Sequence, residues 1–556
     1  MSVQGKLCIA FAQLNPTVGD ISGNLAALRT AHMRAAECGA DLLVTSEMYI
    51  CAYPPEDLVL KHSFQDSLRA AIERLAQETT EGGPAILIGA PWRENGHLYN
   101  AALLLDGGKI AAKTFKYDLP NYGPFDEKRV FNAGPLPEPI SFRGVKLGVM
   151  ICEDMWTPIP AAHLKKQGAE ILIIPNGSPY EGGKIERRRT LAATRVAETD
   201  LPLVYLNQLG GQDELVFDGA SFALDAKGNP VFCLPAWQEE LACIQFHKGK
   251  ISSKKSAKPS ELERDADIYH ALMMGLRDYV NKNDFPGVVL GLSGGIDSAL
   301  AVTIAVDALG ADRVRGVMLP SPYTSTDSTE DAEASARILG CRIDSVPISQ
   351  AMQVFDAALS PLLGNDLQGV PQENIQSRCR GLILMAISNA TGYMVLSTGN
   401  KSEMSVGYAT LYGDMCGGFA VLKDVYKTEV YNISRWRNAN KPTGALGPKG
   451  EVIPARILTK APTAELRPNQ TDQDSLPPYD ILDGILECLI EQDMGMRDIV
   501  AKGYDAATVA KIWALLDKAE YKRRQAAPGV KITRRNLSRD RRYPITNKYR
   551  ERASSR

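Results

Sequence analysis

Residues 288–305, VVLGLSGGIDSALAVTIA, run from a β-branched apolar stretch through a serine–glycine turn into an alanine-rich helical pattern. A strand, a tight turn and a helix in this order are typical of a phosphate-binding loop, because backbone N–H groups at a helix N-terminus attract anions. The lysine that follows the second glycine of a Walker A loop is absent, and Asp297 stands near its place. The loop therefore predicts an anion site that offers hydroxyl groups and a carboxylate.

The chain around and after this loop alternates between strand and helix signals. Helical patterns at Thr329–Leu339 and from Asn374 onward separate the apolar segments VRGVMLP, IDSVPIS and YMVLSTG. Such a βαβ series predicts a parallel sheet whose ligand lies at the carboxyl ends of the strands. The last third of the chain is rich in loop signals.

The first half of the chain also mixes strands and helices, but with hairpins. Two hairpin signals, LYNAALLLDGGKIAAKTFK and ASFALDAKGNPVFC, each turn on a polar loop that contains glycine. Apolar runs that alternate with helical stretches indicate layered α/β structure: LCIAFAQL, DLLVTSEM, AILIGAPW, KLGVMICEDMW and EILIIPNGS. A Lys-, Ser- and Gly-rich segment then separates the halves. We expect an N-terminal domain at 1–250, a linker at 251–265 and a C-terminal domain at 266–556.

The composition is that of a globular protein, with 556 residues of which 44% are hydrophobic and 23% charged. The net charge of −2 gives no overall field that would recruit nucleic acid or a membrane. No run approaches the ~18 apolar residues of a membrane span, and no signal peptide is visible. Ten cysteines without a C-x-x-C pair argue against structural zinc and favour inert core positions in a reduced, cytoplasmic compartment.

The C-terminal segment 522–556 departs from this balance, with thirteen Lys or Arg residues against Asp540 and Glu551. It is either a solvated basic tail or a clamp for phosphates or a neighbouring subunit, and both interpretations stay open. Aromatic side chains for stacking on bases are restricted to Tyr543 and Tyr549, which disfavours nucleic-acid binding.

Three residues of complementary chemistry stand at strand ends in the first half. Cys152 follows the strand KLGVMI, Glu47 follows DLLVTS, and Lys116 precedes YDLPNYGPFDEKR. A thiol with an ordinary pKa near ~8.5 is only a few per cent thiolate at neutral pH, so a nucleophilic cysteine needs a base. The histidines of the chain show no Cys-His signature, which leaves a carboxylate and a lysine as the assisting groups.

The blocks SEMYICAYPPED, KYDLPNYGPFDEKRVF and GVMICEDMW resemble the three signature blocks of the nitrilase superfamily, in that family's order. The resemblance implies an α-β-β-α sandwich with Glu47 as general base, Cys152 as nucleophile and Lys116 as donor to the tetrahedral oxyanion. A buried lysine would both lower the thiol pKa and meet the developing charge. Glu127 matches a carboxylate that positions the amide nitrogen. The positions that match glutamine contacts in glutaminase members are Tyr122, Ser178 and Lys184.

The SGGIDS loop resembles that of the N-type ATP pyrophosphatases, and residues 373–414 resemble the NAD synthetases. This implies a Rossmann-like domain with a parallel sheet, ATP as co-substrate, and Mg²⁺ engaged by Asp297 and Glu403. The implied ATP contacts are Gly291, Leu292, Ser293, Gly294, Gly295, Ile296, Asp297, Ser298, Thr398, Lys427 and Thr463. The implied contacts to deamido-NAD+ are Asn374, Arg378, Glu403 and Lys522. Ammonia-only synthetases carry a lysine and an aspartate at the positions of Leu411 and Gly418. The functions of that lysine and that aspartate are therefore not assigned to this chain.

Taken together, the halves resemble the glutamine-dependent NAD+ synthetases over nearly the whole chain. The resemblance implies amidation of deamido-NAD+ with glutamine and ATP, yielding AMP, diphosphate and glutamate, with NAD+ as product rather than cofactor. It also implies a cytoplasmic homo-oligomer, an octamer, without nucleic-acid or membrane partners. The alternatives are another glutamine-dependent ATP-pyrophosphatase amidoligase, a nucleotide-sensing protein with a degenerate catalytic half, and a nucleic-acid binder that uses the basic segment.

Overall fold

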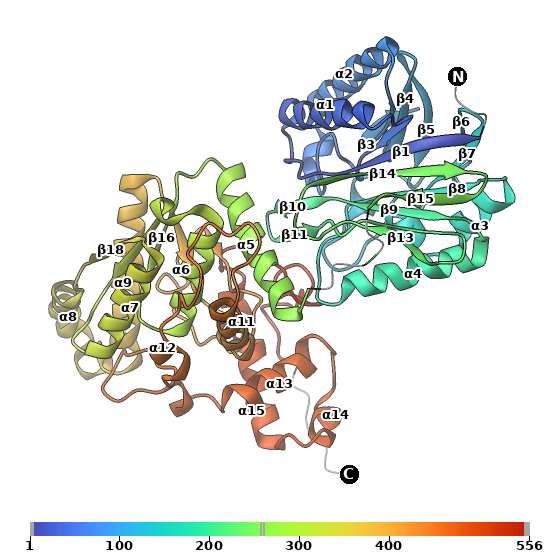
Figure 1. The fold of residues 1–556 in the computed structure, drawn as a ribbon. Helices are drawn as coiled ribbons and strands as arrows, with labels where there is room; N and C mark the ends of the chain where they lie inside the picture. Colours follow the sequence, from blue (N-terminus) through green and yellow to red (C-terminus); the bar gives the residue numbers. More distant parts are fainter. Residues whose placement is uncertain (1–4, 256–257, 259–261, 550–556) are drawn as a thin grey trace. The chain divides into compact units, whose positions relative to one another are not determined.

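The computed structural model describes residues 5–255, 258 and 262–549 (Figure 1). The chain divides into two compact units, Met1–Leu262 and Glu263–Arg556, and each has its own sheets and cores. The segment predicted as a linker is shorter than 251–265, because Lys250–Ser253 forms strand β15 and helix α5 begins at Arg264. Within that segment, residues 256–257 and 259–261 lie outside the described part, as do residues 550–556 of the basic segment.

The first unit is built on a seven-stranded and a six-stranded sheet, in the orders β15-β14-β1-β2-β3-β4-β5 and β13-β12-β9-β8-β7-β6. The first of these consists of β1 (Lys6–Gln13), β2 (Leu42–Val44), β3 (Ala85–Glu94), β4 (His97–Asp106), β5 (Lys109–Phe115), β14 (Glu240–His247) and β15. The second consists of β6 (Ile140–Phe142), β7 (Val145–Val149), β8 (Ile171–Asn176), β9 (Leu203–Asn207), β12 (Phe222–Leu224) and β13 (Pro230–Cys233). A separate ribbon pairs β10 (Leu209–Gln212) with β11 (Leu215–Asp218).

Strand β1 shows why these elements form layers. Successive side chains of a strand point to opposite faces, and both faces of β1 are buried. Leu7, Ile9 and Phe11 pack into one cluster with residues of β7 and β8, so the two sheets lie face to face. Cys8, Ala10 and Ala12 pack instead into a cluster with helices α1 (Ile21–Glu37) and α2 (His62–Glu78).

The outer face of the six-stranded sheet is covered in the same way by α3 (Pro158–Lys166) and α4 (Lys184–Thr199). Figure 1 shows the two helix pairs on opposite sides of the unit. The predicted α-β-β-α sandwich is therefore confirmed. Both predicted hairpins also form, as antiparallel β4–β5 and β12–β13.

The second unit holds a parallel sheet in the order β18-β17-β16-β19-β20, the arrangement of a doubly wound fold. The strands are β16 (Val288–Gly291), β17 (Val314–Met318), β18 (Arg342–Ser345), β19 (Met394–Ser397) and β20 (Phe419–Ala420). Strand order reverses at β16, between β17 and β19. Ligands of such sheets bind outside the carboxyl ends of the strands at this switch point. The predicted Rossmann-like sheet is confirmed.

The helices around this sheet are α5 (Arg264–Lys282), α6 (Ile296–Leu309), α7 (Thr326–Leu339), α8 (Ser349–Leu363), α9 (Val370–Thr391), α10 (Lys401–Val406), α11 (Lys427–Ala439) and α12 (Ala455–Thr459). Every residue of α6 except Asp297 is buried. A buried ion pair joins α6 to its neighbours: Asp307 accepts hydrogen bonds from Tyr269 of α5 and Arg437 of α11, at 2.5 Å and 2.6 Å.

Two sequence expectations for this unit need correction. Helix α7 begins at Thr326, three residues before the predicted start, because Ser325 caps it by accepting from the N–H of Ser328. Helix α9 begins at Val370 rather than Asn374. The last third, predicted as rich in loops, does contain long segments without helix or strand at 440–454 and 524–549. Its helices α13 (Tyr479–Ile490), α14 (Met496–Ala501) and α15 (Ala506–Lys518) share a hydrophobic core with α10, and α16 (Glu520–Arg523) follows α15.

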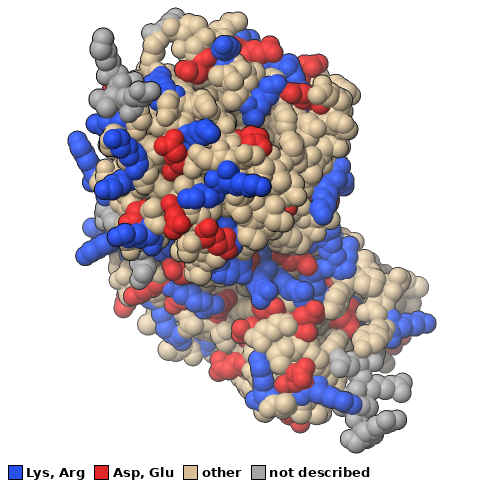
Figure 2. Space-filling view, turned by 90° about the vertical axis from the view of Figure 1, so that its right-hand side faces the viewer, with Lys and Arg blue, Asp and Glu red and all other residues tan. Residues whose placement is uncertain are grey.

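Part of the described basic segment packs into this unit, whereas most residues from 542 to 549 are exposed. Arg523, Lys531 and Arg541 are 4%, 2% and 6% exposed. Their charges pair with Glu520 and Asp540. On the face drawn in Figure 2, lysines and arginines lie among aspartates and glutamates. A solvated tail is therefore the wrong interpretation for these residues. In the described part of the chain, no helix is long and apolar enough to cross a membrane.

Candidate functional site

Cys152 lies in a tight backbone turn directly after β7. It opens the short 3-10 helix Cys152–Met155, and its φ of +46° lies in the left-handed region that non-glycine residues rarely adopt. The thiol is buried, with a relative exposure of 4%. Strained backbone of this kind persists only where its surroundings enforce it, and it clusters at active sites.

A lysine and two carboxylates form a buried charge cluster beside Cys152. The Lys116 Nζ atom donates to Glu47 Oε1 at 2.7 Å and to Glu127 Oε1 at 2.8 Å. All three side chains are at most 5% exposed. The structure thus brings together the three residues that sequence resemblance placed in one catalytic group, with Glu127 as a fourth member. Their electrostatic influence reaches the thiol of Cys152.

Neighbouring donors, which the sequence did not single out, hold the two carboxylates in place. Glu47 accepts at Oε1 from the side-chain amide of Asn100, at 2.7 Å, and at Oε2 from the backbone N–H of Gly177, also at 2.7 Å. Glu127 accepts from the hydroxyl of Tyr53 at 2.8 Å. Asn100 and Gly177 belong to segments predicted as strands, yet no spacing rule connects them to Glu47.

The charge argument made for Cys152 from sequence needs correction. Burial, and then the carboxylate of Glu47, raise the pKa of the Cys152 thiol well above its usual range, although Lys116 acts in the opposite direction. Burial disfavours the charge on Lys116, but the carboxylates of Glu127 and Glu47 outweigh it and hold the lysine pKa well above its usual value. The resting site therefore contains a protonated thiol and a lysine cation, so thiolate formation depends on a base.

The predicted glutamine contacts lie around the same site. The Tyr122 hydroxyl donates to Glu153 at 3.0 Å, and the Tyr122 and Phe125 ring centroids are 5.5 Å apart. Lys184, the first residue of α4, places its Nζ 5.7 Å from the Phe125 ring centroid. The hydroxyl of Ser178 accepts from the buried Arg188 side chain at 3.1 Å. Arg188 was not predicted.

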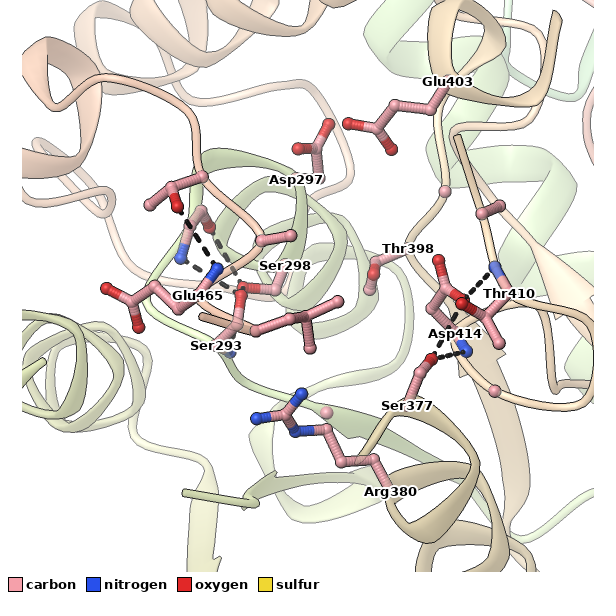
Figure 3. A pocket seen from close by; sticks show the side chains of 18 of the residues that line it. Ser293, Asp297, Ser298, Ser377, Arg380, Thr398, Glu403, Thr410, Asp414 and Glu465 are labelled. Atoms are coloured by element: carbon pink, nitrogen blue, oxygen red, sulfur yellow. Dashed lines mark hydrogen bonds between the residues drawn. The ribbon is translucent and has the colours of Figure 1, made fainter. Parts of the chain in front are cut away.

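The second unit contains a cavity of about 810 Å³ at the carboxyl ends of β16 and β19. Figure 3 shows side chains that converge on it from the glycine loop, from α9 and from the segments after β19. All predicted ATP contacts line this cavity, as do Asn374, Glu403 and Lys522. Arg380, Asp414 and Glu465 also line it, and the sequence did not indicate them.

Two serines of the glycine loop stabilise its conformation through contacts within the loop. Ser298 Oγ donates to the carbonyl of Gly295 at 3.0 Å and lies 3.1 Å from Ser293 Oγ. Gly294 has a φ of +75°, and a Cβ there would lie 2.1 Å from the carbonyl oxygen of Ser328. This close approach allows no side chain, which explains the glycine at this position.

The carboxylates of Asp297 and Glu403 lie close together at the edge of the cavity (Figure 3). Lys427 forms ion pairs with Asp297 and Glu403, the latter at 3.1 Å, and Asn400 donates to Asp297 at 2.9 Å. Burial raises the pKa of Glu403 to about 7, while Lys427 opposes this shift. Within the described residues, no group of three or more His, Cys, Asp or Glu side chains is arranged to hold a metal ion. Any cation here would need oxygen ligands from a substrate as well.

Arg378 is the one predicted substrate residue that the structure does not bring to the cavity. It is exposed on α9, and its Nε donates to the carbonyl of Leu411 at 3.2 Å. Lys522 does reach the cavity wall, where it donates to the carbonyls of Gly407 and Ala409 at 2.8 Å and 2.7 Å. A Cβ at Gly418 would lie 2.8 Å from Cγ of the Met394 side chain, so a longer residue there would require Met394 to shift.

Comparisons with known proteins match both units. Residues 8–255 match the carbon-nitrogen hydrolase family, and residues 268–526 match the NAD synthase family. A glutamine-dependent NAD(+) synthetase of Rhodobacter capsulatus is 48% identical over 548 residues, which is 98% of this chain and 99% of the relative. The structure of a glutamine-dependent NAD+ synthetase from Acinetobacter baumannii, in complex with ADP, is 41% identical, with a TM-score of 0.78 over 98% of this chain and 99% of that one. A Cytophaga hutchinsonii synthetase, 22% identical with a TM-score of 0.81 over 98% of both chains, shares the fold.

Proposed function

Since the chain belongs to the family of glutamine-dependent NAD(+) synthetases, which make NAD+ from deamido-NAD+ with ATP and glutamine, we propose that each unit carries one half of the reaction. The first unit releases ammonia from glutamine at Cys152. The second activates deamido-NAD+ with ATP and joins ammonia to it. Family membership excludes the three alternative functions, which were another amidoligase, a nucleotide sensor and a nucleic-acid binder.

In the first unit, Glu47 takes the proton from the Cys152 thiol as sulfur attacks the carboxamide carbon of glutamine. The C=O electron pair moves to oxygen, and Lys116 donates a hydrogen bond to that oxyanion. When the intermediate collapses, Glu47 returns the proton to the leaving nitrogen, and ammonia departs from a glutamyl thioester. Water, deprotonated by Glu47, then hydrolyses the thioester to glutamate and the free thiol.

The observation that carries this half of the proposal is the triple anchoring of Glu47. Donors from Lys116, Asn100 and Gly177 fix both oxygens of the base, while the thiol beside it stays protonated at rest. A general base must be held within reach of the proton that it removes. We assign the positioning of the amide nitrogen to Glu127, and glutamine binding to Tyr122, Ser178 and Lys184.

In the second unit, we propose that ATP occupies the cavity with its β- and γ-phosphates on the loop from Ser293 to Ser298. The nicotinate carboxylate of deamido-NAD+ attacks the α-phosphorus, which expels pyrophosphate and gives an adenylate. Ammonia then displaces AMP from the activated carbonyl carbon. The hydroxyls of Ser293 and Ser298 and the N–H groups at the start of α6 meet the negative charge of the leaving pyrophosphate.

Asp297 and Glu403 are the residues that we assign to Mg²⁺. Carboxylate oxygens suit this cation, which is commonly bound by one or two protein carboxylates together with substrate phosphates. When bound, Mg²⁺ supplies positive charge against the phosphates. Lys427, which pairs with both carboxylates, provides a second cation at the same place. Thr398, Thr463 and Lys427 complete the ATP contacts in this proposal, and Asn374, Glu403 and Lys522 those to deamido-NAD+.

Arg378 and its helix support the proposal that the protein is a homo-oligomer. Helix α9 exposes Val370, Leu382 and Met385, which are 66%, 64% and 38% exposed. An apolar helix face of this kind is typical of a protein interface. A second copy packed on α9 would cover this face and bring Arg378 next to a neighbouring chain. We retain the octamer and the cytoplasmic location as expectations from the family.

The experiment that tests the division of labour is Cys152→Ala, assayed with two nitrogen sources. We expect no NAD+ formation from glutamine and preserved NAD+ formation from ammonium chloride, because the alanine removes only the nucleophile. Cys8→Ala is the matched control, since Cys8 is also buried in the first unit and lies on β1. Equal loss with both nitrogen sources, or retained glutamine activity, would refute the assignment. AMP and pyrophosphate must accompany NAD+, and stoichiometric ADP would contradict the adenylate route.

A further inference from the structure

Asp154 is a fully buried carboxylate that takes no part in the chemistry proposed above. It lies in the 3-10 helix that begins at Cys152, and its relative exposure is 0%. Its Oδ1 atom accepts from the backbone N–H of Tyr117 at 3.0 Å and of Asp118 at 2.8 Å. Its Oδ2 atom accepts from the backbone N–H of Ile151 at 2.9 Å. A single side chain therefore binds two separate stretches of backbone.

Those two stretches carry two of the proposed catalytic residues. Tyr117 directly follows Lys116, and Ile151 directly precedes Cys152. The two segments are far apart in the sequence and belong to different sheets of the sandwich, since Lys116 follows β5 and Cys152 follows β7. We infer that Asp154 is a positioning residue for the glutaminase step, whose carboxylate fixes the Lys116 backbone relative to the Cys152 backbone. This inference rests on the proposed function of those two residues.

The chemistry of the carboxylate suits this role better than that of any neutral side chain. Only a carboxylate offers acceptor oxygens on both ends, and the three donors use both of them. An asparagine of the same shape would turn its NH₂ group toward a backbone N–H and leave one segment unattached. The left-handed φ of Cys152 adds a second reason, because such a conformation needs several constraints at once.

Burial disfavours the charged form of Asp154. Burial raises the pKa of Asp154 to about 7, against the lowering effect of the Asp118 and Ile151 N–H groups and of Lys116, while the charge of Asp118 raises it further. A residue selected only for packing would not need to be ionisable here. The gain is catalytic geometry, since a displacement of about 1 Å between reacting groups can cost ~100-fold in rate.

The test is Asp154→Asn in the full-length protein, compared with Asp225→Asn. Asp225 also accepts backbone N–H groups, those of Lys227 and Asn229, but in the β12–β13 turn. For Asp154→Asn we expect glutamine-supported kcat to fall about 100-fold, while the KM for glutamine changes little and ammonium-supported synthesis is preserved. The Asp225 variant should keep both activities. A kcat for Asp154→Asn within twofold of that control would overturn the inference, and so would a rise in KM that accounts for the loss.

Asp154→Glu is a second variant that distinguishes a loss of positioning from a loss of folding. It keeps the charge but moves the carboxylate by one methylene, so we expect the same selective loss of kcat with a cooperative thermal transition retained. Full glutamine activity in this variant would also overturn the inference. The Cys152→Ala result separates the two proposals. Glutamine activity that survives in Cys152→Ala contradicts the proposed function itself, whereas an inactive Cys152→Ala beside an active Asp154→Asn contradicts only the positioning role.

Discussion

At the scale of single residues, the state of the Cys152 thiol decides how the first half-reaction starts. Burial and the Glu47 carboxylate raise its pKa, so thiolate is scarce in the free protein at neutral pH. Lys116 is therefore placed to receive the charge that develops on substrate oxygen rather than to maintain a resting thiolate. Glu47 must remove the proton when the substrate arrives.

This assignment predicts the pH dependence of Cys152 alkylation in the free protein. Below the pKa of a thiol, the thiolate fraction rises about tenfold per pH unit, and an ordinary thiol levels off near pH ~8.5. We expect labelling of Cys152 by iodoacetamide to keep rising from neutral pH to beyond that point, because its raised pKa moves the plateau upward. Mass spectrometry of the Cys152 peptide measures this, with the exposed Cys38 as internal reference. A plateau at or below the ordinary value would contradict it.

The residues that carry chemistry could be predicted from sequence more readily than those that hold them. Glu47, Lys116 and Cys152 each follow a recognisable strand and lie in a signature block of the sequence, which identified them although their strands are not neighbours. Asn100 and Asp154 act through contacts across 53 and 37 positions of sequence, as partners of Glu47 and Tyr117. No local pattern encodes such contacts, because each depends on how segments far apart in the sequence come together in the fold.

At the scale of elements, the loop between β16 and α6 depends on the close approach of Gly294 to the backbone of Ser328. Gly294→Ala would combine a left-handed φ with a Cβ only 2.1 Å from the Ser328 carbonyl oxygen. The loop or α7 must shift, so we expect NAD+ synthesis to be lost with either nitrogen source while the first unit still hydrolyses glutamine. Gly450→Ala is the matched control, with a φ of +85° and nothing within 4 Å of its Cβ. Equal activity of the two variants would contradict the prediction.

Long apolar elements are the ones that sequence reasoning located. The strands β1, β3 and β8 and the buried helix α6 all coincide with predicted segments. Helix α8 was missed, and it contains Pro361, which is unfavourable inside a helix. Helices α10, α14 and α16 have six residues or fewer. Helices this short are not stable alone and form because tertiary packing supports them, which no local window reveals.

At the scale of the whole molecule, the exposed face of α9 predicts the assembly state. Leu382→Glu places a charge on this face, and burying it against a second copy would be costly. We expect a smaller oligomer in analytical ultracentrifugation, with unchanged unfolding of the remaining species. Leu446→Glu is the matched control, because both leucines are 64% exposed in the second unit. If both variants keep the assembly of the unmodified protein, α9 is not the contact.

The buried, protonated thiol of Cys152 also bears on survival under oxidative stress. Hydrogen peroxide oxidises thiolates rather than thiols, first to sulfenic acid and then irreversibly to sulfinic and sulfonic acids. A nucleophile that is ionised only while its substrate is in place presents little thiolate to peroxide between turnovers. Ammonia supply from glutamine should consequently persist in oxidising conditions that inactivate enzymes whose catalytic cysteine rests as a thiolate.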